Sequence, residues 1–201
     1  MQSMNCPDPT TEATTVGNFF PQAVGCIETS SIARGLEAAD AMLKAAQVSL
    51  LAANPICPGK YVVIVGGQVA EVNAAVAAGE AVASDTLVDR LVIPNIHPQV
   101  LKAFTATTNP RKIEALGMIE TFSAVAAIIA GDEAVKAAQV DLLEIRLARA
   151  LGGKAFVLLT GEVSAVRAAI EAGNRAARAQ GLLLGFTIIP SPHPDLIPSL
   201  V

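Results

Sequence analysis

The sequence predicts an α/β fold made of two tandem copies of one small unit, and three observations lead to it. First, the segment Val24–Leu51 recurs 92 residues later as Leu116–Leu143, with 14 of the 28 positions identical. Second, each copy alternates short apolar runs with longer segments of helical spacing, in the order β-α-β-β-α-β followed by a small helix. Third, hydrophobic residues are 52% of the chain and aromatic residues only 3%, so aliphatic side chains must build the core. This element order is typical of an α+β, ferredoxin-like unit with two helices covering one face of a sheet.

The elements follow from the apolar runs of each copy. In the first copy they are expected at Ala23–Thr29 (strand), Ile32–Ala46 (helix), Val48–Ala53 and Tyr61–Val65 (strands), Val69–Ala83 (helix) and Leu91–Pro94 (strand). In the second copy the same types recur at Ala115–Thr121, Ala124–Ala138, Val140–Ala148, Ala155–Leu159, Val163–Ala179 and Leu184–Pro190. Ser31 and Ser123 precede the first helix of each copy and are placed to cap it.

The repeat also sets the predicted domain boundaries. Residues 1–22 are polar, lack a basic start and an apolar stretch, and are expected to form a flexible extension rather than a secretory signal. The two domains are expected at 23–104 and 115–201. Residues 105–114, which are polar and contain Pro110, are the expected linker.

Composition excludes several classes of function. The net charge is −4 and the basic residues are not clustered, so no nucleic-acid surface is expected. No apolar run approaches the roughly 20 residues of a membrane span. Charged residues are only 16% of the chain, against about 25% in a typical soluble domain. We therefore expect a cytosolic protein that buries apolar surface between subunits.

Short motifs in both copies resemble the bacterial microcompartment domain in its unpermuted order. They include Gly25-Cys-Ile-Glu-Thr, Gly66-Gly-Gln-Val, Ile93-Pro-Asn-Ile-His-Pro and, in the second copy, Ile189-Pro-Ser-Pro-His-Pro. The family often has Pro-Arg-Pro-His at the last motif. Asn95 and Ser191 stand where that Arg would fall, which leaves its edge contact in doubt. The resemblance implies a shell protein in the bacterial cytoplasm, not an enzyme, whose homotrimer forms a pseudohexameric disc and joins other shell proteins.

The resemblance also implies a central pore lined by the loop between the second and third strands of each copy. The implied lining residues are Ile56, Cys57, Pro58 and Gly59 from the first copy and Leu151, Gly152 and Gly153 from the second. The string Ile56-Cys-Pro-Gly-Lys resembles the pore loop of shell proteins of the propanediol-utilisation T type. That resemblance implies an iron–sulfur cluster, [4Fe–4S], one per trimer, bound by Cys57 on the three-fold axis.

Chemistry alone leaves the pore cysteine open to two interpretations. A trimer brings three thiolates to one axis, whereas a [4Fe–4S] cluster is ordinarily held by four, so the fourth iron would need another ligand. A free thiol in a passive, metal-free pore is the alternative, since a lone Cys most often behaves as a small hydrophobe. Cys26 lies in an apolar strand and is expected in the core, and Cys6 is assigned no role.

Other polar residues recur in both copies. Lys44 and Lys136, at equivalent helix ends, would face the perimeter of the tile if the resemblance holds, although solvated lysines near a helix C-terminus are the plainer interpretation. His97 and His193 each lack neighbouring ligands in the sequence and are expected to have a structural role at a subunit edge. Glu28 and Glu120 follow an apolar strand and are expected to hydrogen-bond between neighbouring domains, because no second catalytic group is near either.

Three functions remain open from the sequence. The first is a shell tile with a redox centre at its pore that passes electrons across the shell, with a lumenal redox enzyme as a possible partner. The second is a cluster-free tile whose pore admits small metabolites. The third is a soluble ferredoxin-like regulatory or ligand-binding protein, which would need a cleft with convergent polar groups.

Overall fold

The structure is a computed structural model that describes residues 21–104, 108, 112–148 and 151–200. In the first copy it contains β1 (Ala23–Thr29), α1 (Ile32–Ala45), β2 (Ser49–Ile56), β3 (Lys60–Gly67), α2 (Val69–Ala83), η1 (Ser84–Thr86), β4 (Leu87–Pro94) and α3 (Pro98–Phe104). In the second copy it contains β5 (Ala115–Thr121), α4 (Ala124–Ala137), β6 (Asp141–Arg146), β7 (Ala155–Gly161), α5 (Val163–Ala179), β8 (Leu183–Ile189) and η2 (Pro194–Ser199). The predicted extension (residues 1–22) falls almost wholly outside the described residues, as do Cys6 and most of the linker.

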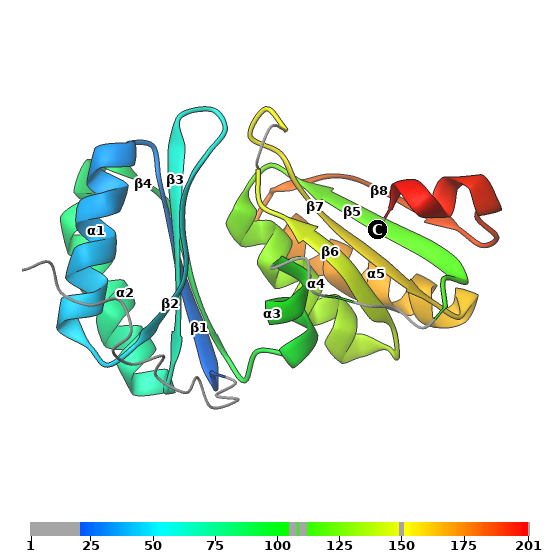
Figure 1. Ribbon diagram of the computed structural model, residues 1–201, viewed down its shortest axis with the longest axis horizontal. Coiled ribbons are helices and arrows are strands. Elements are labelled where there is room, and N and C mark those ends of the chain that lie inside the picture. Colours follow the sequence, from blue (N-terminus) through cyan, green and yellow to red (C-terminus); the bar gives the residue numbers. More distant parts are fainter. Residues whose placement is uncertain (1–20, 105–107, 109–111, 149–150, 201) are drawn as a thin grey trace, which may run out of the picture.

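Each copy forms one four-stranded antiparallel sheet. The strand orders are β2-β3-β1-β4 and β6-β7-β5-β8, so the two copies have the same topology. In each copy two long helices, α1 with α2 or α4 with α5, cover one face of the sheet (Figure 1). The predicted ferredoxin-like order and the two-helix layer are confirmed.

Local sequence explains where the helices begin and why the central strand is apolar. The Ser31 hydroxyl accepts a hydrogen bond from the Arg34 N–H, and the Ser123 hydroxyl accepts one from the Ala126 N–H. These are the predicted N-caps, and each satisfies an orphan donor of the first turn. All seven residues of β1 are buried, because β1 lies between two strands and is covered on both faces.

The second copy covers the outer face of the first sheet. Cys26 and Ile64, on that face, belong to the same apolar cluster as Ala124 and Ile128 of α4. The short helix α3, at the end of the first copy, lies against β6 of the second (Figure 1). The interface between the copies is therefore a hydrophobic core rather than a loose contact, and it fixes how the two sheets face one another.

Several predicted strand bounds differ from the observed ones, and two of these differences have a plain physical reason. The second strand continues past Ala53 through Pro55 to Ile56; it is an edge strand, where a residue without an N–H is tolerated. The fourth strand begins at Leu87 rather than Leu91, since its polar residues find partners outside the core. The strand predicted at Val140–Ala148 is shorter, spanning Asp141–Arg146. In the part of the chain that the structure describes, no helix is long and apolar enough to cross a membrane.

Candidate pore loops and the interface between the copies

The two loops predicted to line a pore lie against one another within a single chain. The Cys57 N–H donates a hydrogen bond of 3.0 Å to the Ala148 carbonyl oxygen, which joins the β2–β3 loop to the end of β6. Both loops stand at the same end of the molecule, at the top of Figure 1. Residues far apart in the sequence are thus brought together at one end of the chain.

Glycines allow this close approach. Gly153 has φ +89°, and a Cβ placed on it would lie 3.0 Å from Pro58 Cδ and 3.4 Å from the Cys57 carbonyl oxygen. Gly59 and Gly152 also have positive φ, at +74° and +61°, in the region that favours glycine. Larger residues at these three positions would strain the loops or push them apart.

The predicted loop residues differ in exposure. Cys57 is a half-buried free thiol, whereas Pro58 and Gly59 are exposed. Ile56 is only 5% exposed and belongs to the cluster between the copies, so it anchors the loop from below. Within the described residues, no group of three His, Cys, Asp or Glu side chains is placed to hold a metal ion. Among residues 21–104, 108, 112–148 and 151–200, Cys57 is therefore not part of such a group.

A buried ion pair holds the base of the cysteine loop. Glu28 is 1% exposed, and its Oε1 lies 2.7 Å from the Nζ of Lys60, the residue that closes the loop and begins β3. The other carboxylate oxygen of Glu28 is buried without a hydrogen-bond partner among the described residues. Within this chain the ion-pair partner of Glu28 lies in its own copy rather than in a neighbouring domain, and the contact expected between domains stays a prediction. Lys60 was quoted in the loop motif, but nothing in the sequence paired it with Glu28.

Cys26 lies in the core, as predicted. Its side chain is fully buried in the cluster shared by the two copies. Burial, reinforced by the negative charges of Glu28 and Asp89, raises the pKa of the Cys26 thiol well above its ordinary value. It stays protonated in the folded chain near neutral pH, which makes it a poor metal ligand.

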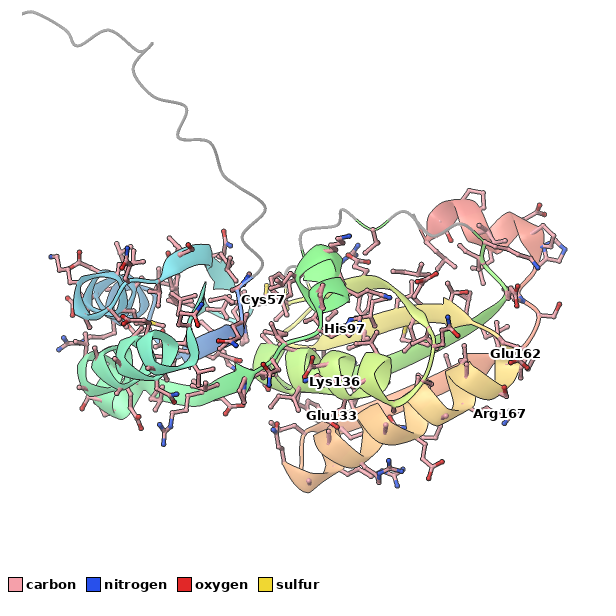
Figure 2. The ribbon with its side chains drawn as sticks, turned by 90° about the horizontal axis from the view of Figure 1, so that it is seen from below. Cys57, His97, Glu133, Lys136, Glu162 and Arg167 are labelled. Atoms are coloured by element: carbon pink, nitrogen blue, oxygen red, sulfur yellow. The ribbon has the colours of Figure 1, made fainter. Side chains whose placement is uncertain are left out.

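His97 and Lys136 meet at a buried carboxylate between the copies. Asp132 of α4 is 2% exposed; its Oδ1 accepts a 2.8 Å hydrogen bond from the His97 N–H, and its Oδ2 pairs with Lys136. His97 and Lys136 are labelled in Figure 2. The His97 ring accepts a hydrogen bond from the Gln99 N–H and so caps α3. Both predicted edge residues therefore have structural partners within the chain. Asp132 was missed as a functional residue, although its identity with Asp40 in the repeat was a signal.

The corresponding residues of the other copy are exposed. Asp40 pairs with Lys44 at 2.6 Å on the surface of α1, with both side chains more than half exposed. The His193 side chain is 75% exposed and accepts a hydrogen bond from the Asp195 N–H, repeating the His97 cap. Within this chain Asp40 and His193 do not meet.

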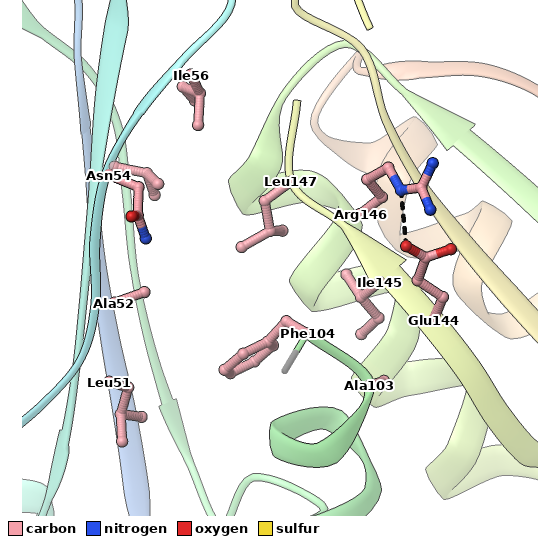
Figure 3. Close-up of a pocket in the computed structure, with 11 residues that line it drawn as sticks. Leu51, Ala52, Asn54, Ile56, Ala103, Phe104, Glu144, Ile145, Arg146 and Leu147 are labelled. Atoms are coloured by element: carbon pink, nitrogen blue, oxygen red, sulfur yellow. Dashed lines mark hydrogen bonds and ion pairs between the residues drawn. The ribbon is translucent and has the colours of Figure 1, made fainter. Parts of the chain in front are cut away.

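A pocket of about 480 Å³ lies between β2 and β6, beneath the two loops (Figure 3). Leu51 and Phe104 give it apolar walls, and an ion pair of 2.6 Å between Glu144 and Arg146 lies on its other side. It is part of the interface between the copies and holds no cluster of convergent metal-binding groups.

Comparison with known proteins agrees with this architecture. Residues 23–96 and 115–192 each match the BMC domain. The bacterial microcompartment shell protein PduT of Citrobacter freundii is 45% identical over 175 residues, which cover 87% of this chain and 95% of that protein. The carboxysome assembly protein CcmO of Synechococcus elongatus is 33% identical over 191 residues, covering 89% of this chain and 68% of that protein. Among solved structures, a microcompartments protein from Desulfitobacterium hafniense DCB has a TM-score of 0.82 at 51% identity, covering 88% of this chain and 98% of that one.

The match extends over both copies and most of the chain, and it sets aside the soluble regulator considered from the sequence. It places the chain in the shell of a microcompartment in the bacterial cytoplasm. The chain belongs to the family of bacterial microcompartment shell proteins, as a member with two BMC domains in tandem.

Proposed function

We propose that three copies of this chain close into a pseudohexameric shell tile that carries an iron–sulfur cluster on its axis and passes electrons across the shell. The observation that carries the proposal is the junction of the two loops at Cys57, reached from both copies at one end of the chain. Other shell proteins are its proposed neighbours in the shell, and a lumenal redox enzyme is its proposed electron partner. The role is structural and electron-conducting, not enzymatic.

Ring closure is supported by the surface that α1 leaves uncovered. On α4, Ala124 and Ile128 are fully buried against the first sheet. Their counterparts on α1, Ile32 and Leu36, are 47% and 61% exposed. Because α1 carries apolar side chains at the positions where α4 packs on the first sheet, α1 is expected to pack on the outer face of another sheet.

The second sheet supplies that face. Its outer side carries a small apolar cluster, Leu116, Leu143 and Leu158, which is 3–5% exposed, and the partly buried Met118 and Phe156 pack against it. Packing this face on α1 of the next chain repeats the internal interface. It also brings the His193 N–H of one chain toward Asp40 of the next, as His97 meets Asp132. A head-to-tail contact of this kind generates a ring when its rotation closes, and three chains with two domains each give six similar interfaces.

The donor set fits a cluster shared by three chains. Cys57 is half-buried on a loop, and the pair of Glu28 with Lys60 holds that loop in place. Three Cys57 thiolates would hold a [4Fe–4S] cluster with one iron left for a non-protein ligand, since four thiolates are usual. When bound, the cluster supplies reversible one-electron transfer. The residues of this chain would hold the three thiolates at one opening.

The proposal is tested by anaerobic reconstitution of the full chain with iron and sulfide. Wild type should acquire both elements and a broad visible absorbance, whereas Cys57→Ser should acquire neither. Cys6→Ser is the matched control and should load as wild type does. If Cys57→Ser keeps its iron, or if wild type never acquires any, the redox function fails. A tile with an open pore for small metabolites would then be the better description.

A further inference from the structure

A second pocket, of about 460 Å³, lies between α5 and the edge strand β8, away from the loops and from the interface between the copies. Its floor is apolar, formed by Ile170 and Ile188 with the half-exposed ring of Phe186. Three arginines of α5 line it: Arg167, Arg175 and Arg178. Figure 2 shows Arg167 on the outer side of this helix.

The charge of the pocket is positive. Arg175 pairs with Glu171 at 3.1 Å, and both side chains are mostly exposed. In the part of the chain that the structure describes, no ion pair is formed by Arg167 or Arg178. Three guanidinium groups against one carboxylate leave two net positive charges, and guanidinium is the side chain best suited to bidentate contacts with phosphate oxygens.

The first copy lacks the arginines that line this pocket, so they are not a general requirement of the fold. At the places of Arg167, Arg175 and Arg178 the first copy has Asn73, Ala81 and Ser84. There Glu80 of α2 forms an ion pair of 2.7 Å with Arg90 of β4, across the corresponding groove. In the second copy Asn174 stands in place of Glu80 and Phe186 in place of Arg90. The ion pair that spans the groove in the first copy therefore has no equivalent at these two positions.

Asn174 has no equivalent of the ion pair that its counterpart Glu80 forms with Arg90. It lines the pocket, is only 6% exposed, and its Oδ1 has no hydrogen-bond partner among the described residues. Buried polar atoms are normally paired. Rotation of the amide by half a turn exchanges its oxygen and nitrogen, so Asn174 can offer a ligand either an acceptor or a donor.

The pocket stays accessible in the proposed ring. The interface between the copies uses β1, β4, α3, α4 and β6, while α5 packs on α4 and on its own sheet. The counterpart helix α2 likewise packs on α1 and on its own sheet. Repeating the internal interface between chains therefore leaves the groove of α5 and β8 uncovered.

We propose that this pocket binds a nucleoside diphosphate. The arginines match the charge and geometry of the two phosphates, and the exposed ring of Phe186 offers a planar apolar surface for the base. Asn174 supplies a polar contact to the sugar or the base edge. The volume lies in the usual range for small-ligand sites, about 300–1,000 Å³, and is larger than phosphate alone requires. The proposal is independent of the cluster.

Titration calorimetry of the full chain with ADP tests the proposal. Arg175→Gln and Arg178→Gln should each weaken ADP binding by about tenfold or more, as expected for loss of a charge-assisted contact. Arg34→Gln is the matched control, since Arg34 is an exposed arginine of α1 paired with Glu37; its ADP affinity should stay within about twofold of wild type. Adenosine and pyrophosphate, each carrying half of the ligand, should bind much more weakly than ADP.

The first copy provides the sharpest variant. The double substitution Asn174→Glu with Phe186→Arg transplants the pair of Glu80 and Arg90 into the second copy, where it should close the groove, keep the fold by circular dichroism and abolish ADP binding. Failure of wild type to bind ADP at about 1 mM, unchanged affinity in the double variant, or equal affinity for pyrophosphate and ADP would each overturn the proposal.

Discussion

Asp40 and Asp132 occupy the same place in the two copies, yet one is exposed and the other is buried. Asp132 is 2% exposed and accepts contacts from His97 and Lys136, whereas Asp40 pairs with Lys44 at the surface. The residues are identical in the sequence, so their difference comes entirely from the second copy being packed against the first. The environment of a residue in one copy therefore does not predict the environment of its equivalent in the other copy.

Lys136→Ala should therefore destabilise the chain more than Lys44→Ala. Removing Lys136, which is 37% exposed, leaves the buried carboxylate of Asp132 with only the His97 N–H, at a cost of about 1–2 kcal/mol. Removing Lys44, which is 75% exposed, should cost no more than about 0.5 kcal/mol. Urea unfolding of both variants measures the difference, and equal losses would contradict the role given to Asp132.

Cys26→Ser should lower the free energy of unfolding at pH 7 by about 1–3 kcal/mol, because it buries a hydroxyl in an apolar cluster. The difference should depend on pH. Since the pKa of the Cys26 thiol is raised by folding, the unfolded chain loses this proton first as pH rises above about 8.5. Wild type then loses stability relative to Cys26→Ser, by at most about 1.4 kcal/mol per pH unit. Urea unfolding between pH 7 and 10 should show the gap narrowing; a constant gap would contradict the burial argument.

At the scale of elements, the internal repeat predicted strand bounds better than the spacing of apolar residues did. The strands Ala23–Thr29 and Ala115–Thr121 were predicted with their observed bounds, because each begins with an apolar run and ends at the same Glu-Thr pair in both copies. The second strand was predicted too short, since Pro55 reads as a breaker unless the strand is known to lie at a sheet edge. Edge position is a property of the folded sheet and leaves no local mark in the sequence.

The sequence singled out the two loops, but it did not predict the contacts that hold them. Cys57 and the Gly-rich loop of the second copy were singled out from the repeat and the motif, and the structure places them in contact. The pairing of Glu28 with Lys60 joins residues 32 positions apart on neighbouring strands. Such a contact depends on sheet register, which a single sequence does not specify.

Helix α1 should be an interface between chains, and Leu36 tests this. Leu36 is 61% exposed, so Leu36→Asp should leave the chain folded while abolishing the trimer in sedimentation velocity. Its counterpart Ile128 is fully buried within the chain, so Ile128→Asp should destabilise the chain itself by about 3 kcal/mol or more. A trimer that persists in Leu36→Asp would show that the ring closes through another face.

At the scale of the whole molecule, one chain is a third of the proposed ring. One interface between BMC domains forms inside the chain, and the two surfaces that would repeat it, α1 and the outer face of the second sheet, are proposed to meet neighbouring chains. This explains why a chain with only 16% charged residues exposes apolar side chains such as Ile32 and Leu36. It also explains why the two copies diverge, since only one of each pair of equivalent surfaces is covered within the chain.

In the proposed assembly the trimers tile into sheets, and Lys44 is expected to take part in the contacts between them. Lys44 lies at the exposed end of α1, whereas Lys136 is committed to Asp132. Lys44→Asp should therefore abolish extended sheets in negative-stain electron microscopy while trimers persist. Sheets that form as in wild type would show that Lys44 does not lie at the perimeter.

Native mass spectrometry of the anaerobically reconstituted protein tests the central claim most directly, because one spectrum reports both the ring and its cluster. Wild type should give one dominant species, with the mass of three chains plus one iron–sulfur cluster. Cys57→Ser should give three chains with no added mass, since the loop residue is a ligand and not part of the core. A wild-type species of one chain, or a Cys57→Ser trimer that still carries the cluster, would contradict the account.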